Sequence, residues 1–306
     1  MWEQEGFDMK TRIKQKLDLS AYFYIAPAVI LMAVFIFYAL GSSFYISLTN
    51  WKGLGAMKFI GFDNYVRLVK DATFWNSIKL QLIWALLSVV LLALSGLIFA
   101  IMIEFVVTNK RLQTLFRTVL FMPMMMSLIA IGLLWSLVYN PSMGLLNEGL
   151  HFLGLLGSGK SIDLLGNYDL AIFAVFVPAL WQWSGFGMVI FSAAIKGIPQ
   201  DIIEASIVDG CSLFGRIKYV ILPFLRPSIM MVCTLNLIGG LKCFDLIYAM
   251  TGGGPGTSTL VTSIYQFKQA FVNSSYGYSA TISFVLFIIT VLLGLGFFSI
   301  SKRVEN

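Results

Sequence analysis

Residues 154–161 carry the chain's most suggestive chemical pattern, Gly-Leu-Leu-Gly-Ser-Gly-Lys-Ser. It fits the phosphate-binding loop G-x-x-x-x-G-K-[ST], in which backbone amides and a lysine cradle phosphates at the start of a helix. That chemistry needs a strand before the loop and a helix after it. Residues 162–167 leave little room for a helix, and the flanking apolar runs enclose too little chain for a nucleotide-binding fold. We therefore interpret the segment as a flexible Gly/Ser turn.

Other side chains capable of chemistry are scattered. His151 is the single histidine, and no cysteine lies near it, so we expect no metal site. Glu148 and Asp163 are interpreted as solvated loop charges. The three cysteines lack metal-ligand spacing and are not expected to form a disulfide; they are Cys211, Cys233 and Cys243. No nucleophile lies beside a base, which predicts a chain that is not an enzyme and binds no cofactor.

The composition indicates which elements hold these residues. Hydrophobic residues make up 58% of the 306 residues and charged residues only 12%, whereas soluble domains average about 25% charged. A membrane-spanning helix takes about 20 apolar residues. We therefore expect an all-α membrane protein with six spanning helices, at residues 22–48, 78–107, 116–139, 170–195, 220–241 and 280–300.

Lysine and arginine predict the orientation. Most of the 21 Lys and Arg residues fall in segments that lie inside if the N-terminus is cytoplasmic. We expect a cytoplasmic segment at 1–21, a transmembrane domain at 22–300 and a cytoplasmic tail at 301–306. The first apolar run is too long for a cleaved signal peptide. These inner loops account for the net charge of +6, so no nucleic-acid partner is expected.

One polar segment, 199–223, separates the fourth and fifth apolar runs. Pro199 suits the start of a helix, and Asp201 and Glu204 complement the helix dipole in its first turns. Gly210 suits the end of that helix, and Ser212 can cap a second one. We therefore expect two short helices in a cytoplasmic loop.

The surface chemistry of this loop favours a protein partner. A helix that lies on lipid usually carries Lys or Arg on its polar face, but this one carries Asp201, Glu204 and Asp209. Ala205 and Ser206 are small enough to let another backbone approach closely. The alternative, an interfacial helix resting on lipid, fits the charges less well.

At these residues the chain resembles a known family. Glu204-Ala205-Ser206, then Gly210, then Val220-x-Leu222-Pro223 resembles the EAA loop of permease subunits of binding-protein-dependent ABC importers. In that family the loop forms a coupling helix that sits in a cleft of the ATP-binding subunit. The resemblance implies a coupling loop at 197–218 whose ATPase-coupling residues are Asp201, Glu204, Ala205, Ser206, Asp209, Gly210 and Phe214.

Further motifs extend the resemblance over nearly the whole chain. They are Tyr24-Ile-Ala-Pro27, Phe62-Asp-Asn-Tyr65, Phe116-Arg117 with Met122-Pro123, Trp135 with Gly144-Leu-Leu-Asn147, and the run from Phe244 to Pro255. Together they are similar to the carbohydrate-type, MalF-like branch. The resemblance implies a type I importer permease fold in the membrane of a prokaryotic cell. It implies as partners a second permease subunit, two ATP-binding subunits that hold ATP and Mg, and an extracytoplasmic solute-binding protein.

Polar and aromatic residues within the fourth and fifth spans are candidates for a solute path, because polar groups inside a span are functional candidates. On this ground the predicted path residues are Gln182, Trp183, Phe186, Asn236, Lys242, Cys243 and Asp245. The resemblance to the MalF-like branch implies Gly239 and Gly240 as well, because they align with sugar-contact positions of that branch. Aromatic packing alone is an alternative reading of Trp183 and Phe186. Lys242 and Asp245 are spaced to pair with each other.

The expected cargo is a neutral sugar or oligosaccharide. A glycerol-3-phosphate or polyol importer is an open alternative, although phosphate calls for clustered basic residues and only Lys242 is evident. A secondary transporter that needs no ATPase, or a membrane scaffold protein, are further alternatives. Secondary transporters often show internal repeats, and none is evident here.

Overall fold

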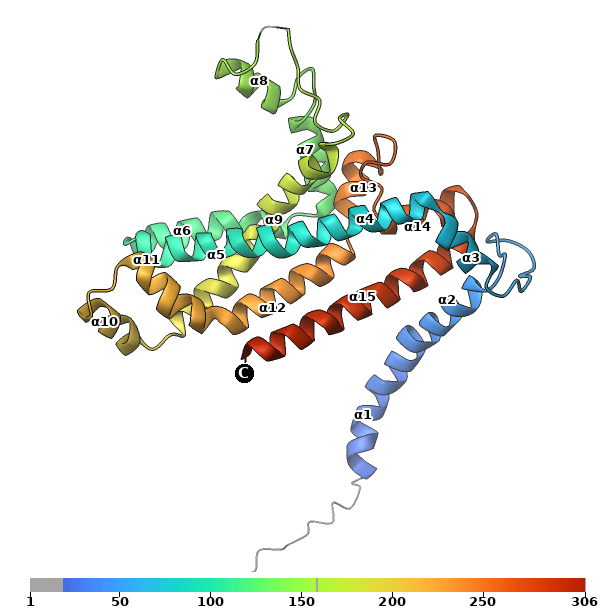
Figure 1. Cartoon of the computed structure of the whole chain (residues 1–306), viewed down its shortest axis with the longest axis horizontal. Helices are drawn as coiled ribbons and strands as arrows, with labels where there is room; N and C mark the ends of the chain where they lie inside the picture. The colour runs from blue at the N-terminus through green and yellow to red at the C-terminus, as the bar shows by residue number, and fades with distance from the viewer. Residues whose placement is uncertain (1–18, 158, 306) are drawn as a thin grey trace, which may run out of the picture.

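The computed structural model describes residues 19–157 and 159–305, almost all of them in helices or their connections (Figure 1). Within these residues the only β pairing is an isolated bridge between Thr49 and Phe59. The first half of the chain forms α1 (Leu19–Met32), η1 (Ala33–Tyr38), α2 (Ala39–Ser47), α3 (Asp63–Lys70), α4 (Ala72–Leu87), η2 (Ser88–Leu92), α5 (Ala93–Ile101), η3 (Met102–Val106), α6 (Lys110–Phe121), η4 (Met122–Met125), α7 (Leu128–Val138) and α8 (Leu145–Phe152). The second half forms α9 (Ala171–Lys196), α10 (Gln200–Val208), α11 (Leu213–Arg216), η5 (Ile217–Ile221), α12 (Leu222–Leu241), α13 (Asp245–Thr251), α14 (Thr262–Phe267), η6 (Lys268–Val272) and α15 (Tyr276–Glu305).

Five uninterrupted helical stretches in the described chain are long and apolar enough to cross a membrane. They are Phe23–Ser47, Ala72–Val106, Ala171–Lys196, Leu213–Leu241 and Tyr276–Ser299. A bent pair of helices, Lys110–Met125 and Leu128–Val138, counts as a sixth crossing when its two halves are taken as one broken span. The prediction of an all-α membrane protein with six spans is confirmed, with helix ends that differ from the expected ones by several residues.

The third span is not the continuous helix expected at 116–139. Its two halves meet at 101°. Pro123 lies in the 3-10 turn η4, and Met126 and Ser127 are extended, so the helical ladder ends there and restarts in α7. The Gln182 amide donates to the carbonyl oxygen of Met126 at 3.1 Å, which satisfies a backbone acceptor that the break leaves open.

We name the two ends of the helical bundle after the helices α10 and α13. The α10 end holds α10, α11, the start of α6 and the C-terminal turns of α15, and the α13 end holds α3, α8, α13 and α14 (Figure 1). Helix α9 runs between the two ends and is the most enclosed span. It packs against α5 where Gly96 and Gly187 face each other, because a side-chain carbon on Gly96 would lie 2.8 Å from the Gly187 backbone.

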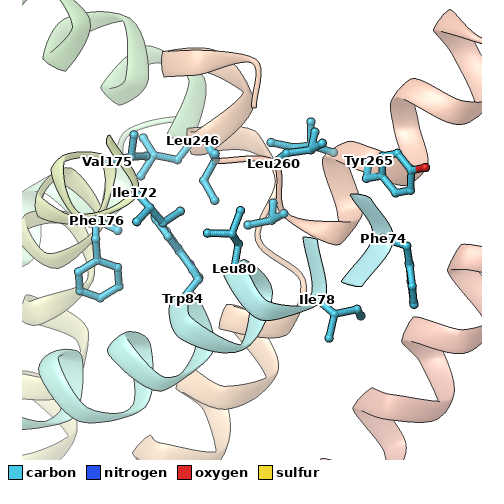
Figure 2. Packing of buried hydrophobic residues seen from close by; sticks show 14 of the residues in the cluster. Phe74, Ile78, Leu80, Trp84, Ile172, Val175, Phe176, Leu246, Leu260 and Tyr265 are labelled. Carbon is cyan, nitrogen blue, oxygen red and sulfur yellow. The ribbon is translucent and has the colours of Figure 1, made fainter. Parts of the chain in front are cut away.

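Two apolar clusters hold the bundle together. One lies toward the α13 end, where Trp84 of α4 meets Phe176 of α9 edge to face at 5.1 Å, with Leu80 and Ile172 close by (Figure 2). The other lies toward the α10 end and includes Met188 and Phe191 of α9. Helix α9 contributes to both clusters and therefore connects the two halves of the bundle.

The first span stands largely apart from the rest (Figure 1). Helix α2 packs on α15, with the rings of Phe44 and Phe284 4.8 Å apart. From Phe23 to Tyr38, by contrast, the apolar side chains are almost all exposed. Apolar surface of this extent requires lipid or another chain around it.

Candidate functional site

A pair of glycines shapes the end of α12. A side-chain carbon on Gly240 would lie 2.8 Å from the Ala85 Cα and 3.1 Å from the Ser88 Oγ, so α12 and α4 touch almost backbone to backbone. A side-chain carbon on Gly239 would meet nothing within 4 Å. One glycine permits close helix packing, and the other faces open space.

That open space is a cavity of about 330 Å³ between α4–η2, α9, α12 and the start of α13. Its volume lies within the range of about 300–1,000 Å³ that is usual for small-molecule sites. Eight of the nine predicted path residues line it: Trp183, Phe186, Asn236, Gly239, Gly240, Lys242, Cys243 and Asp245. The structure thus brings together residues from two separate spans at one site.

Gln182 is the predicted path residue that does not line the cavity. It is buried and turned toward the third span, where its amide binds Met126. Neighbouring Trp181 packs on Trp135, with ring centres 6.0 Å apart. Helical geometry explains the division, because adjacent residues on α9 point in different directions and Trp183 and Phe186 share the cavity side.

The wall opposite α9 was not predicted. It comes from the second span, where Trp84 and Ser88 line the cavity. The signal in the sequence is a set of larger or polar residues at one helical face of an apolar run, namely Ser77, Gln81, Trp84 and Ser88. Trp84, Trp183, Phe186 and Phe244 together give the cavity aromatic sides.

The cavity also contains both signs of charge. Lys242 and Asp245 are exposed on its wall. They do not pair with each other, because the ion pair found among the described residues joins Arg117 to Glu104 at 2.5 Å, near the α10 end. Pairing of Lys242 with Asp245, the alternative considered from sequence, is therefore not observed. With Asn236, the two charges offer donors and acceptors inside a largely apolar site.

Non-helical backbone closes the cavity toward the α13 end. Helix α12 stops at Leu241, and the connection to α13 passes Cys243. The Gln81 amide donates to the Gly240 carbonyl oxygen at 2.8 Å and to the Cys243 sulfur at 3.1 Å. The Ser263 hydroxyl of α14 donates to the Cys243 carbonyl oxygen. Burial raises the pKa of the Cys243 thiol to about 12, and the hydrogen bond from Gln81 opposes the shift only in part.

The predicted pair of short helices lies at the opposite end. Helix α10 ends at Val208, and Gly210 follows with a φ of +71°. The amides of Gly210 and Cys211 donate to the carbonyl oxygens of Ile207 and Ser206, which is the Schellman arrangement of a helix end. Ser212 caps α11 by accepting from the Gly215 amide at 3.2 Å. The expected helix stop and cap are confirmed.

Most of the predicted coupling residues face outward. Asp201, Glu204, Ala205, Asp209, Gly210 and Phe214 are exposed, the last by 75%. Ser206 is buried, and its hydroxyl donates to the Ile203 carbonyl oxygen at 2.6 Å, so it supports the helix from the side of the bundle. Val208 is 86% exposed and was not predicted. The surface combines acidic groups with apolar side chains that project from it.

The region of the phosphate-loop pattern lacks the context that the pattern needs. It follows the short helix α8 and not a strand, and the next helix after it, α9, begins only at Ala171. His151 instead lies with its Nδ1 3.2 Å from the Leu156 carbonyl oxygen. The part of the chain that the structure describes contains no cluster of three or more potential metal ligands.

Comparison with known proteins identifies relatives over nearly the whole chain. Residues 96–306 match the family described as the binding-protein-dependent transport system inner membrane component. The lactose transport system permease protein LacF of Rhizobium radiobacter is 31% identical over 300 residues, which cover 96% of this chain and 98% of LacF. The trehalose/maltose transport system permease protein MalF of Thermococcus litoralis is 31% identical over 287 residues, covering 93% and 94%.

A solved structure has the same fold. It is a chain of a bacterial ABC transporter involved in the import of the acidic polysaccharide alginate. The two chains superpose with a TM-score of 0.83 at 22% sequence identity, covering 94% of this chain and 97% of the other. The order and packing of the spans are therefore those of a known transporter subunit.

Proposed function

Because the chain belongs to the family of inner membrane components of binding-protein-dependent transport systems, we propose that it forms one half of the path of a sugar through an ATP-driven importer. The observation that carries this proposal is the aromatic-walled cavity of about 330 Å³ between the spans. Sugars present apolar faces that stack on aromatic rings and hydroxyl groups that need donors and acceptors. Trp183, Phe186 and Asn236 supply these two kinds of contact from α9 and α12.

The chain acts as a permease subunit, and ATP hydrolysis takes place in a partner. Two ATP-binding subunits holding ATP and Mg dock at the α10 end, and a second permease subunit completes the path. The exposed acidic and apolar surface of α10 and α11 supports this docking, because it has the mixed character of a protein interface. The α10 end then faces the cytoplasm, with both chain termini on that side.

The order of the helices along the chain offers a way for a movement driven by ATP hydrolysis at α10 to be transmitted to the cavity. The segment 197–218 joins the end of α9 to the start of α12, and the same two helices wall the cavity. A displacement of α10 by the ATPase therefore moves the α9 and α12 walls together, relative to the wall formed by Trp84 and Ser88 of the second span. An extracytoplasmic binding protein delivers the sugar at the α13 end, and alternating closure of the two ends carries it through the membrane of a prokaryotic cell.

A neutral sugar fits the charges better than a phosphorylated solute. Lys242 is the basic residue on the cavity wall, and Asp245 stands close to it in the chain. Phosphate recognition usually relies on clustered basic groups. A polyol importer differs from a sugar importer only in cargo and shares every step described above.

Docking of the ATPase is tested by co-purification. Glu204→Lys reverses a charge on the exposed face of α10 and is expected to reduce recovery of the ATP-binding subunit at least about tenfold, because loss of one partner of a buried interface charge pair costs about 2 kcal/mol or more. Glu148→Lys is the matched control, because it changes an exposed glutamate of a short helix at the other end. Full uptake by the purified chain without any ATPase would refute the proposal.

Cargo identity is tested in two stages. A panel of glycans and polyols is screened by thermal shift of the cognate binding protein, and the compounds that bind are then tested for uptake. Trp183→Ala is expected to reduce uptake of the selected sugar while leaving ATPase recovery unchanged. A preference of the binding protein for glycerol phosphate would overturn the assignment of a neutral sugar.

A further inference from the structure

Gln81 lies where the cavity closes. Ser77, Gln81, Trp84 and Ser88 follow one another at spacings of four, three and four residues, so they share one face of the second span. All four are buried. Trp84 and Ser88 line the cavity, and Gln81 lies one turn beyond it toward the α13 end.

The Gln81 amide joins α4 to the end of α12 and the connection that follows it. These two parts of the chain must separate if the cavity is to open at this end. It binds the Gly240 carbonyl oxygen at 2.8 Å and the Cys243 sulfur at 3.1 Å, and both partners line the cavity. Between these partners α12 ends, and the chain turns through Lys242 into α13. This side chain therefore ties the irregular closing segment to the second span.

The other end of the same amide group is unused. The Gln81 Oε1 is buried and has no hydrogen-bond partner among the described residues, and the residue as a whole is only 1% exposed. Buried polar atoms nearly always have a partner, so an orphan atom calls for an explanation. A hydroxyl group of a solute beside this atom would supply the missing donor.

From these contacts we propose that Gln81 is a latch that closes the cavity toward the α13 end and exchanges its protein partners for solute hydroxyl groups when that end opens. The inference rests on the proposed sugar path. It assigns Gln81 a positioning and gating role, which differs from the role of the residues that line the cavity. The bond between Ser263 and the Cys243 backbone stays in place, because it holds the closing segment to α14 and not to α4.

Cys243 provides a test that does not depend on knowing the sugar. The assembled transporter, with Cys211→Ser and Cys233→Ala, is treated in intact cells with a membrane-impermeant methanethiosulfonate. The parent Cys243 is expected to react slowly, because its thiol is enclosed and protonated. In Gln81→Leu, which keeps the bulk but removes both polar atoms, the rate is expected to rise about tenfold as water reaches the thiol.

Gln182→Leu is the matched control. Gln182 is a second buried glutamine with an orphan Oε1, but its amide binds Met126 away from the cavity. Its variant is expected to leave Cys243 labelling unchanged, and co-purification of the ATPase verifies that each variant assembles. Equal labelling of Gln81→Leu and its parent, or an equal rise in Gln182→Leu, would overturn the latch.

Uptake separates failure of the latch from failure of the proposed path. Gln81→Leu is expected to raise the sugar concentration for half-maximal uptake while the affinity of the isolated binding protein is unchanged. If Trp183→Ala abolishes uptake but Gln81→Leu changes neither labelling nor uptake, the latch is wrong and the path stands. If labelling rises in Gln81→Leu but no sugar is taken up by the parent, the closing contact is real and the proposed cargo is wrong.

Discussion

Neighbouring residues of one kind can serve opposite purposes, as the glycines at the end of α12 illustrate. Gly240 is pressed against Ala85 and Ser88, and Gly239 faces the cavity. Both were predicted to lie on the path from the resemblance to the MalF-like branch. A Gly-Gly pair in a span gives no sign of which member faces a neighbouring helix. Their roles separate only when the direction of α12 relative to α4 is known.

This difference predicts opposite results for two alanine variants. Gly240→Ala is expected to lower stability by about 1–3 kcal/mol, because the new carbon would overlap the α4 backbone. Gly239→Ala is expected to leave stability equal or raise it by up to about 1 kcal/mol through helix propensity. Thermal unfolding of the purified complex measures both. A larger loss for Gly239→Ala would show that its space is filled in the assembled protein.

Asp71 is the centre of a polar cluster at the α13 end. Its carboxylate caps α4 through the amides of Thr73 and Phe74 and accepts hydrogen bonds from the hydroxyls of Tyr265 and Tyr278. These bonds join α4, α14 and α15. Burial alone would raise the pKa of Asp71, but the hydrogen bonds outweigh burial and lower it from the ordinary value of 3.8.

The lowered pKa predicts a loss of stability in acid. A depressed pKa in the folded state means that the stabilisation is complete above the ordinary value of 3.8 and is lost as the pH falls through the folded-state pKa. Asp71→Asn is expected to lower the melting temperature at pH 7, which corresponds to a loss of about 1–2 kcal/mol of stability, and to flatten the fall of the melting temperature below the ordinary pKa of 3.8. A parallel fall in both proteins would contradict the assignment.

At the scale of elements, the sequence predicts what depends on local chemistry. The end of α10 near Gly210 and the N-terminal cap of α11 at Ser212 were predicted, because helix ends use few residue types. The break after Pro123 was not, since prolines within packed spans often cause no break. The cavity wall formed by Trp84 and Ser88 was also not predicted. These residues line a cavity only because α12 packs against the second span, and the sequence does not show that packing.

The helix stop at Gly210 yields a prediction with a close control. Its φ of +71° favours glycine or asparagine, and no atom crowds the position. Gly210→Val is therefore expected to cost about 1–2 kcal/mol locally through backbone strain alone, which loosens α10 and reduces ATPase stimulation by the loaded binding protein. Gly210→Asn is expected to behave nearly like the parent. Equal stimulation in both variants would show that the geometry of α10 is unimportant.

At the scale of the whole molecule, α9 links the cavity to the α10 end. It belongs to both apolar clusters and crosses α5 at the contact between Gly96 and Gly187. The cavity residues Trp183 and Phe186 lie immediately before this crossing in the chain, and α10 lies after it. This crossing is one of two close backbone contacts of α9 in the same region, the other being that of Gly185 with Leu120 of α6. We expect α9 to tilt about its crossing with α5.

This contact can be tested with Gly96→Ala. The added carbon would lie 2.8 Å from the Gly187 backbone, so α5 and α9 must move apart at a cost of about 1–3 kcal/mol. Because the contact lies between the cavity and α10, we expect fewer sugar molecules imported per ATP hydrolysed as well as a lower melting temperature. Gly294→Ala, in α15 with open space around it, is the control and should change neither quantity. If Gly96→Ala lowers stability but leaves the ratio of uptake to hydrolysis unchanged, the crossing is a packing contact only and tilting occurs elsewhere.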